Sequence, residues 1–468
     1  MSSFGSLNAA TTALWAQRRA LDVTGQNIAN VNTEGYSRQR AELRALGGSA
    51  VPAFYSKSPG IGAGVSADDV TRIRDAFLEG RGHVEHANSA RLGVESDTYA
   101  LVQDAFREPG DTGIQSLLSD MWNAWGDVEN GPQELATRQQ ALESLNTLVQ
   151  GIHFSQDSLG AQWVESRENL VVLVQDSNAA IDNIAELNRA IQRAQQQGLP
   201  ANELADQRDL MVMQLSEKLG ATVRPNKEGM VDVVVGGMTV VAGTTATKLA
   251  VAGTTDPDGT GTDPVRVVTA SGGYTVSVGG TAEGHRNTMN VIVPGYRSQL
   301  DSLANDLADV LNTQHALGFD LDGVAGTDLL GSSSGPITAA SLTVLISDER
   351  KVAASSSGPV GGVPSLDTGN ADALYQKRQL PDGIDATYRQ MIVSLGVQAG
   401  VTDRNLGIQQ VITTQVDAAR ESVAGVNLDE EMSNMLSFQH AYSAAARLIT
   451  AIDQTLDVLI NQTGIVGR

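Results

Sequence analysis

Apolar residues recur at heptad spacing near the C-terminal end of the chain. From Leu428 to Leu459 the positions spaced three and four residues apart are apolar, with Glu431 as the one exception. The stripe consists of Leu428, Glu431, Met435, Phe438, Tyr442, Ala445, Ile449, Ile452, Leu456 and Leu459. Such spacing is typical of a helix that packs its apolar side against a second helix. A coiled-coil helix is therefore predicted over this segment.

A matching but weaker pattern lies at the N-terminal end. Leu7, Leu14, Leu21 and Ile28 recur every seven residues, and a companion row consists of Ala10, Gln17, Thr24 and Val31. The two ends are expected to pair, with the rest of the chain between them. A purely internal bundle is the alternative. The terminal position, the presence of a partner stripe and a strict repeat over about 32 residues, roughly 48 Å of helix, favour assembly with other chains.

Between these ends the pattern changes twice. Helical spacing dominates from about residue 71 to 220, with expected breaks at Pro109-Gly110, Gly131-Pro132 and Gly198 to Pro200. Apolar residues then alternate with polar ones from about 222 to 293, and Gly236-Gly237 and Gly272-Gly273 fit hairpin turns. Helical spacing resumes at Pro294. The β segment is thus expected to be an insertion in a mainly helical fold.

These patterns predict a mainly α fold with a smaller β insertion. Terminal helices would form a coiled-coil stalk, followed by a helical-bundle middle domain and a small, hairpin-rich outer domain. The expected domains are a terminal coiled-coil inner domain (1–45 plus 400–468), a mainly helical middle domain (46–220 plus 294–399) and a small β outer domain (221–293).

The composition of the chain excludes several classes of function. The 468 residues are 41% hydrophobic, enough for a sizeable core, and the net charge of -22 would repel nucleic acids and anionic lipids. The longest apolar run, Leu170 to Val174, is far shorter than the roughly 20 residues that span a bilayer. No cysteine occurs, and aromatic residues are only 4%, so neither a thiolate site nor an aromatic cofactor pocket is indicated. We expect no nucleic acid, membrane or cofactor.

Two motifs have alternative chemical interpretations. Ser333 lies in a Gly-Ser-Ser-Ser-Gly stretch that formally matches a hydrolase elbow, but the only later histidine, His440, lies on the outer side of the heptad helix, so a flexible loop is favoured. Glu79, His83 and His86 could share a helical face as metal ligands, yet a fourth ligand is lacking, and a solvated face is favoured. No catalytic or metal residue is therefore predicted.

Two acidic turns resemble parts of calcium-binding loops. They are the segments Asp256 to Gly259 and Asp320 to Gly323. A calcium loop also needs a closing glutamate at a fixed spacing, and neither segment has one. Both are interpreted as ordinary acidic turns.

One N-terminal motif resembles a known family. The run Asn27-Ile28-Ala29-Asn30-Val31-Asn32-Thr33-Glu34-Gly35-Tyr36 is similar to the Asn-Ile-Ala-Asn-x-Asn-Thr-x-Gly-Tyr pattern of the rod, hook and junction proteins of the bacterial flagellar axis. Further stretches are similar to the first hook-filament junction proteins within that superfamily, and they span nearly the whole chain. They are residues 205–209, 312–315 with 318–323, 346–349, and 425–431.

The resemblance implies a structural protein and not an enzyme. It implies a ring of copies at the hook-filament junction, with the hook protein below and a second junction protein and the filament above. It also implies export by the flagellar type III apparatus, an extracellular flagellar location and a cytoplasmic chaperone on the C-terminal helix. The first residues, which lack the pattern of a Sec signal, agree with such export.

The assembly interface is expected to comprise the two stripes and the N-terminal motif. Its residues are Leu7, Leu14, Leu21, Asn27, Ile28, Asn30, Asn32, Gly35, Tyr36, Met435, Phe438, Tyr442, Ile449, Ile452, Leu456 and Leu459. Because only a short Ser/Gly-rich stretch follows the Gly-Phe-Asp loop, where many family members carry a larger insertion, the outer domain should be small. A hook or distal-rod protein, or a surface enzyme on an assembly stalk, remains the alternative.

Overall fold

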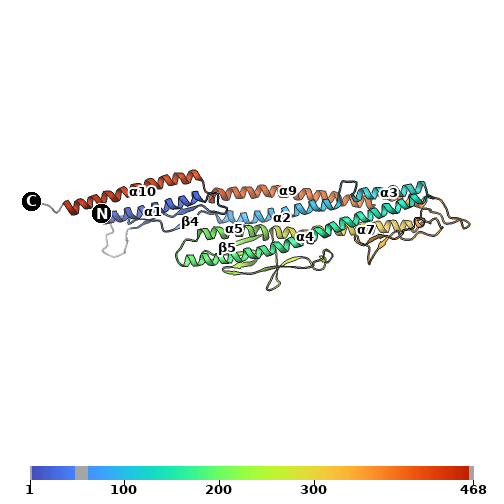
Figure 1. Ribbon diagram of the computed structural model, residues 1–468, viewed down its shortest axis with the longest axis horizontal. Helices are drawn as coiled ribbons and strands as arrows, with labels where there is room; N and C mark the ends of the chain where they lie inside the picture. Colours follow the sequence, from blue (N-terminus) through green and yellow to red (C-terminus); the bar gives the residue numbers. More distant parts are fainter. Residues whose placement is uncertain (1–2, 48–61, 463–468) are drawn as a thin grey trace, which may run out of the picture.

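The computed structural model describes residues 3–47 and 62–462 and is a long rod made mostly of helices (Figure 1). The helices are α1 (Ser3–Ala29), α2 (Ala76–Phe106), α3 (Ile114–Asn130), α4 (Leu135–Gln196), α5 (Asn202–Leu219), α6 (Gly280–Asn287), α7 (Val293–His315), α8 (Gly369–Gln376), α9 (Ile384–Ala424) and α10 (Leu428–Asp457). Small antiparallel sheets complete it, so the predicted mainly α class is confirmed.

Helix α1 and helix α10 lie side by side at one end of the rod, and both chain termini are at that end (Figure 1). We call these two helices the terminal pair, and we call residues 76–424 the body. Two short antiparallel strand pairs accompany α1. They are β1 (Gln39–Ala41) with β4 (Val70–Arg72), and β2 (Arg44–Leu46) with β3 (Gly64–Ser66). The predicted pairing of the terminal helices is thus present within one chain.

Local sequence signals explain where the helices begin and end. The Asp75 side chain caps α2 by accepting hydrogen bonds from the backbone N–H groups of Phe77 (2.8 Å) and Leu78 (3.1 Å). The Asn427 side chain caps α10 in the same way. The predicted breaks near residues 109, 131 and 198 are confirmed as the gaps that separate α2, α3, α4 and α5. These signals act locally, so the helix boundaries follow from short stretches of sequence.

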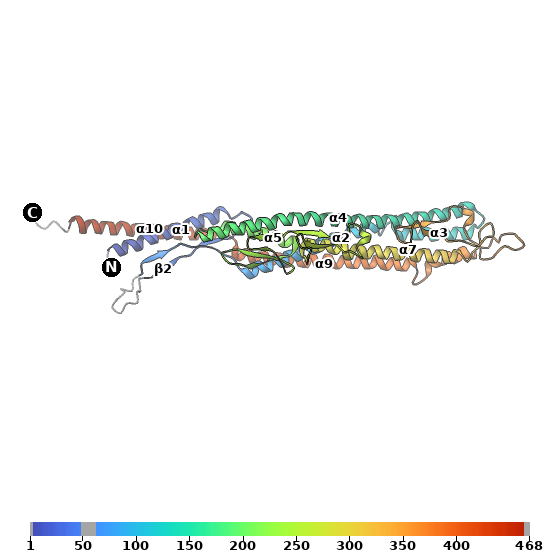
Figure 2. The ribbon, with the colours of Figure 1, turned by 90° about the horizontal axis from the view of Figure 1, so that it is seen from below.

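The β segment lies along the body beside α4 and α5 (Figure 2). One sheet has the order β5-β6-β7-β8 and the other β11-β10-β9. Their strands are β5 (Ala221–Pro225), β6 (Val231–Val235), β7 (Met238–Ala242), β8 (Thr245–Ala246), β9 (Leu249–Ala252), β10 (Arg266–Thr269) and β11 (Thr275–Val276); β12 (Leu330–Ser332) pairs separately with β13 (Leu342–Val344). The two predicted hairpins are confirmed. Gly236 and Gly237 turn the first at φ angles of 52° and 85°, which glycine adopts readily.

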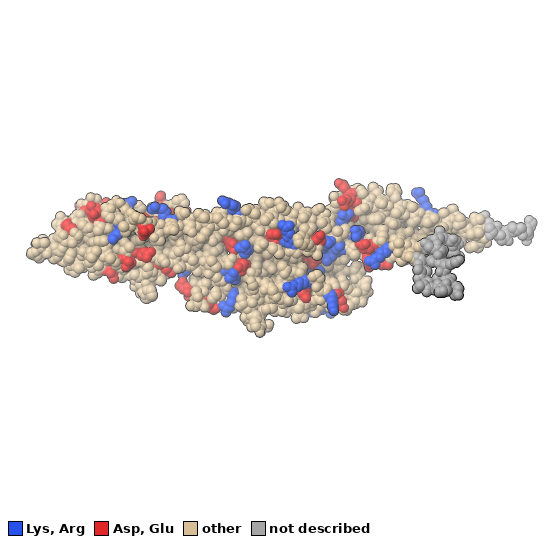
Figure 3. Space-filling model, turned by 180° about the vertical axis from the view of Figure 1, so that it is seen from behind, with Lys and Arg blue, Asp and Glu red and all other residues tan. Residues whose placement is uncertain are grey.

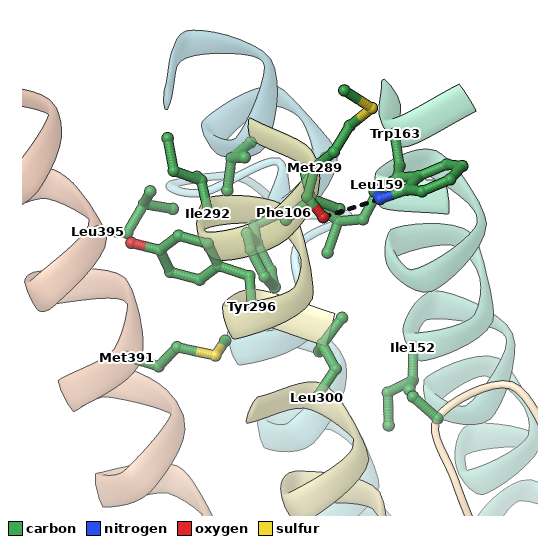
Figure 4. Close-up of a cluster of buried hydrophobic side chains, with 14 of the residues drawn as sticks. Phe106, Ile152, Leu159, Trp163, Met289, Ile292, Tyr296, Leu300, Met391 and Leu395 are labelled. Carbon is green, nitrogen blue, oxygen red and sulfur yellow. Dashed lines mark hydrogen bonds between the residues drawn. The ribbon is translucent and has the colours of Figure 1, made fainter. Parts of the chain in front are cut away.

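A continuous apolar core holds the body helices together (Figure 4). The Phe106 ring meets Tyr296 edge-on, with ring centroids 6.2 Å apart. The indole N–H of Trp163 donates to the Met289 carbonyl oxygen at 2.8 Å, so this buried polar group is satisfied. Because α2, α4, α7 and α9 all contribute to this core, the body provides a firm support for the terminal pair.

Candidate assembly site

The most deeply buried side of α1 carries small and polar residues. Ala10, Ala16, Ala20, Val23, Thr24 and Asn27 are buried. The predicted row Leu7, Leu14, Leu21 and Ile28 is half-buried. Small side chains allow close approach between helices, which explains why the alanines rather than the leucines lie deepest. The leucine row therefore lies at the margin of the contact within one chain, and its role between copies stays a prediction.

On α10 the predicted stripe is the side that faces the chain. Glu431, Ala445 and Ile452 are buried. The half-buried members are Met435, Phe438, Tyr442, Ile449 and Leu456, whereas Leu459 is exposed. The N-terminal stripe and this one are thus brought together at the same end of the rod, which is the arrangement that an assembly site on the terminal helices requires.

Large apolar side chains also lie on the outer surface of the terminal pair. Trp15 on α1 is 72% exposed, and Met432 and Leu436 on α10 are 58% and 56% exposed. A hollow of about 430 Å³ opens beside Trp15, between α1 and the β2–β3 strands. Exposed apolar surface of this kind marks contact sites for other macromolecules. These side chains are not covered by the rest of the described chain.

Polar side chains join the base of α1 to the start of α10. The Asn27 side-chain amide donates to the Gln39 carbonyl oxygen (2.9 Å) and to Glu431 Oε2 (3.1 Å). Its oxygen Oδ1 accepts from the Tyr36 hydroxyl (2.8 Å) and the Gln39 backbone N–H (2.9 Å). All four hydrogen-bonding positions of this 1% exposed amide are thus used.

Arg38 completes this arrangement. Its Nε donates to Glu431 Oε1 at 2.8 Å, and its Nη1 donates to Glu430 Oε2 at 2.9 Å. Glu431 is only 2% exposed and interrupts the apolar stripe because it accepts these charge-assisted bonds. We call the contacts among Asn27, Tyr36, Arg38 and Glu431 the joint.

The remaining motif residues shape the turn after α1. The Asn30 amide donates to the Gln26 carbonyl oxygen at 3.0 Å, and Asn32 is exposed. Gly35 has a φ of 76°, which places it in the left-handed region that favours glycine. Burial, with the neighbouring carboxylates of Asp206, Glu203 and Glu431, raises the pKa of Tyr36 to about 12. The Tyr36 hydroxyl therefore stays protonated and can donate to Asn27.

A second set of charges connects the joint to the body. Arg72 donates to Asp206 (2.8 Å) and Asp209 (2.9 Å), and Arg74 pairs with Asp209 and with Glu79. Burial would raise the pKa of Asp209, but the guanidiniums of Arg208, Arg74 and Arg72 lower it. We call Arg72, Arg74, Asp206 and Asp209 the arginine clamp. In the sequence, Asp206 to Asp209 stand out only through the family resemblance, and nothing local indicates that Arg72 and Arg74 meet them.

The helical face with Glu79, His83 and His86 is not solvated as predicted. His83 is only 4% exposed, and burial lowers its pKa to about 4. Glu79 pairs with Arg420 at 3.0 Å, while His86 Nδ1 contacts Glu217 at 2.8 Å and His86 Nε2 contacts Asp417 at 3.0 Å. The prediction was wrong because α5 and α9 cover this face of α2.

The other chemical candidates are not assembled into sites. Ser333 is exposed on the body, whereas His440 is exposed on α10 of the terminal pair. The Asp320 carboxylate accepts from the backbone N–H groups of Asp322 and Val324, and Lys351 neutralises Asp322 at 3.1 Å. Within residues 3–47 and 62–462, no three His, Asp or Glu side chains are grouped to hold a metal ion.

Charges on the surface are mixed in sign. On the face shown in Figure 3, acidic and basic side chains alternate over the middle of the rod. None of the helices in the described part of the chain is long and apolar enough to cross a bilayer. The described surface of the terminal pair therefore combines paired charges with exposed apolar residues.

Comparisons with known proteins agree with this architecture. Three family models match the chain: "Flagella basal body rod protein" over residues 7–36, "Flagellar hook-associated protein FlgK helical domain" over 99–330, and "Flagellar basal body rod FlgEFG protein C-terminal" over 420–462. The first and last of these segments correspond to the terminal pair. The class so defined is the axial structural proteins of the bacterial flagellum.

Full-length relatives identify the branch within that class. Flagellar hook-associated protein 1 of Bacillus subtilis is 28% identical over 100% of both chains, and the Escherichia coli protein of that name is 23% identical over 97% of this chain and 99% of its own. The chain thus matches the family model of the hook-associated helical domain and is similar along its whole length to relatives named flagellar hook-associated protein 1. The relatives are named as structural components, and the chain is a structural protein, not an enzyme.

A solved structure shares the fold. It is described as the flagellar hook junction protein FlgK from Burkholderia pseudomallei, with a TM-score of 0.63 and 16% identity. The match covers 74% of this chain and 100% of that one. At this level of identity the similarity supports the fold alone.

Proposed function

We propose that this protein forms a ring of copies at the hook-filament junction of the bacterial flagellum and that the terminal helices seat each copy. The names of its full-length relatives, which specify hook association, support this location. In this proposal the hook protein lies below the ring, and a second junction protein and the filament lie above it.

The observation that carries the proposal is the incomplete burial of the terminal pair. Glu431, Ala445 and Ile452 are buried against the chain, while Trp15, Met432 and Leu436 remain exposed. Two helices cannot cover each other's apolar surfaces on all sides, so additional helices from neighbouring copies would complete the packing. The partly covered predicted row that includes Leu14 and Leu21 would then lie between copies.

The proposal includes how the subunit reaches its site. We propose export through the flagellar type III apparatus to an extracellular position. A cytoplasmic chaperone would hold α10 before export, because its exposed apolar residues would otherwise promote aggregation.

The proposed three-domain division has a physical basis. The joint holds α1 and α10 together, and the arginine clamp connects the segment after α1 to the body through polar contacts, whereas the body has its own apolar core. A boundary at the joint would allow the inner domain to adjust its angle to hook or filament.

A substitution in the terminal pair tests the proposal. Ile452→Asp places a charge in a buried apolar position, and we expect it to abolish junction formation in a strain that lacks its own copy. Gln454→Asp adds the same charge on the exposed side of α10 and serves as the matched control. Urea unfolding of the body should be the same for both variants. Normal filament attachment with Ile452→Asp would overturn the proposed role of the terminal pair.

A further inference from the structure

Helix α9 has a second apolar face that the chain leaves uncovered. Tyr388, Met391 and Leu395 point into the core. Five large apolar residues lie on the opposite side of the same helix, and each is exposed: Val393, Val397, Val401, Ile408 and Val411. We call these five residues the α9 stripe.

The α9 stripe follows one side of the helix and is interrupted by Arg404, between Val401 and Ile408. At about 100° per residue, positions 393, 397, 401, 408 and 411 fall within one side of the helix. Gly400 lies at the edge of that side, and a Cβ added there would meet nothing within 4 Å. The surface is therefore shallow and apolar, so a partner helix could approach it closely.

The only charged side chains within the stripe are basic. Arg389 and Arg404 lie on this face, are exposed, and form no ion pair with another described residue. A partner that covers the stripe should therefore present carboxylates among apolar residues.

Helix α4 of the same protein carries such a face. Val164 and Val172 are 40% and 56% exposed, and Glu165 and Glu168 lie exposed beside them on one side of the helix. Neither glutamate is in an ion pair within the described chain. We call Val164, Glu165, Glu168 and Val172 the α4 face.

The two surfaces lie on opposite edges of the rod. Helix α4 and helix α9 are separated by other helices in both ribbon views (Figures 1 and 2). They cannot meet within one copy, but two copies placed side by side in the same orientation would bring the α9 stripe of one against the α4 face of the next. Such a heterologous contact repeats around a ring.

The two surfaces also lie at matching positions along the long axis of the rod. Figure 4 shows Leu395 of α9 at roughly the level of Leu159 of α4, and both helices run in the same direction along the rod. Arg404 lies nine residues beyond Leu395, and Glu168 lies nine residues beyond Leu159. If neighbouring copies are aligned along the long axis of the rod, Arg404 of one copy would therefore lie opposite Glu168 of the next.

We infer that the α9 stripe is a docking surface for the α4 face of a second copy of this chain. The inference rests on the proposed ring and adds a contact between bodies to the contacts between terminal pairs. An ion pair between Arg404 and Glu168 sets the position of one copy relative to the next along the rod axis. The apolar residues on either side of this pair are buried in the contact.

Cysteine pairing tests this contact in assembled flagella. The chain has no cysteine of its own. The variant with Arg404→Cys and Glu168→Cys should give a ladder of disulfide-linked multimers on a non-reducing gel after mild oxidation of isolated flagella, because only residues with Cα atoms within about 7 Å can bond. The matched control pairs Arg404→Cys with Glu186→Cys, which is exposed about 27 Å further along α4 and should give no ladder.

Charge exchange provides a second readout. Arg404→Glu and Glu168→Arg should each lower the number of filament-bearing hooks by about tenfold, and the double exchange should restore it. Restoration, or a ladder specific to position 168, supports the inference. Normal assembly without a ladder, or single reversals that behave as wild type, overturns it and leaves the proposed junction role intact. If wild-type protein itself does not restore junctions in the deletion strain, both proposals fail.

Discussion

The side-chain amide of Asn27 donates a hydrogen bond to Glu431 across 3.1 Å, linking positions 404 residues apart in the sequence. This contact joins the predicted N-terminal motif to the single polar position of the C-terminal stripe. Both side chains are buried, so their polar atoms depend on each other and on Arg38 and Tyr36 for partners. The joint thereby fixes the register of α1 against α10.

Replacing Asn27 should loosen the terminal pair. Asn27→Leu leaves the Tyr36 hydroxyl, the Gln39 backbone N–H and one oxygen of Glu431 without this partner, which should lower the free energy of local unfolding by about 2–4 kcal/mol. Hydrogen exchange of backbone amides in α1 and α10 measures this directly. Asn30→Leu is the control, because its side chain bonds only to nearby residues at the surface. Equal exchange rates in the two variants would count against the joint.

Arg38 and Arg40 should differ sharply although both form ion pairs. Arg38→Ala leaves the buried Glu431 charge uncompensated and should cost about 3 kcal/mol or more. Arg40 pairs with Glu42 with 65% of its side chain exposed, so Arg40→Ala should cost less than about 1 kcal/mol. Thermal and urea unfolding of the two variants checks the difference. A similarly small loss of stability in both variants would contradict the role of Arg38 in compensating the buried Glu431 charge.

Asp209 should be the most sensitive member of the arginine clamp. It pairs with Arg72, Arg74 and Arg208, so Asp209→Asn should lower the free energy of unfolding by about 3 kcal/mol. The exposed pair between Asp263 and Arg266 supplies the control, and Asp263→Asn should change stability by less than about 1 kcal/mol. The comparison is made by urea unfolding at pH 7, where a loss from Asp209→Asn no larger than the control would contradict the clamp.

The burial of His83 should make the folded protein less stable in acid. Burial lowers its pKa in the fold from 6.5 to about 4. As pH falls below the unfolded value, the unfolded chain binds a proton that the folded chain does not, so stability decreases between pH 6.5 and 4 by roughly 3 kcal/mol. His83→Gln removes this contribution. Urea unfolding from pH 7 to pH 4 should show a smaller loss for this variant than for wild type, and parallel curves would refute the prediction.

The contacts of His86 should make the folded protein less stable as the pH rises above neutrality. Its hydrogen bonds to Glu217, which is the larger cause, and to Asp417 raise its pKa above the ordinary 6.5. Its stabilising contribution is therefore complete below pH 6.5 and is lost as pH rises through the raised pKa. Wild type should lose stability between pH 6 and pH 8.5 relative to His86→Gln, as measured by urea unfolding. A difference that does not change across this range would contradict the charge-assisted contact.

The helix boundaries and hairpins could be predicted because their signals are local. Proline, glycine and capping residues act over a few positions, as at Pro109 and at Gly236-Gly237. The pairing of the ends could also be predicted, because the heptad period of α10 is visible in the sequence.

Long-range contacts could not be predicted in the same way. The sequence marks Glu431 as an exception in its stripe, but Asn27 and Arg38 lie about 400 positions away, and nothing local indicates that they meet it. The burial of His83 depends on α5 and α9, which cover a helix face that looks polar in isolation. The sequence pattern predicted that the leucine row of α1 forms the centre of its contact within the chain. In the structure the smaller Ala16 and Ala20 are more deeply buried.

The junction role is tested most directly by adding purified protein to isolated hooks and locating it by electron microscopy. We predict that the full-length chain caps the distal hook end and that a chain truncated after Val426, which lacks α10, does not. Binding along the whole hook, absence of binding, or equal capping by the truncated chain would contradict a junction subunit seated by its terminal helices.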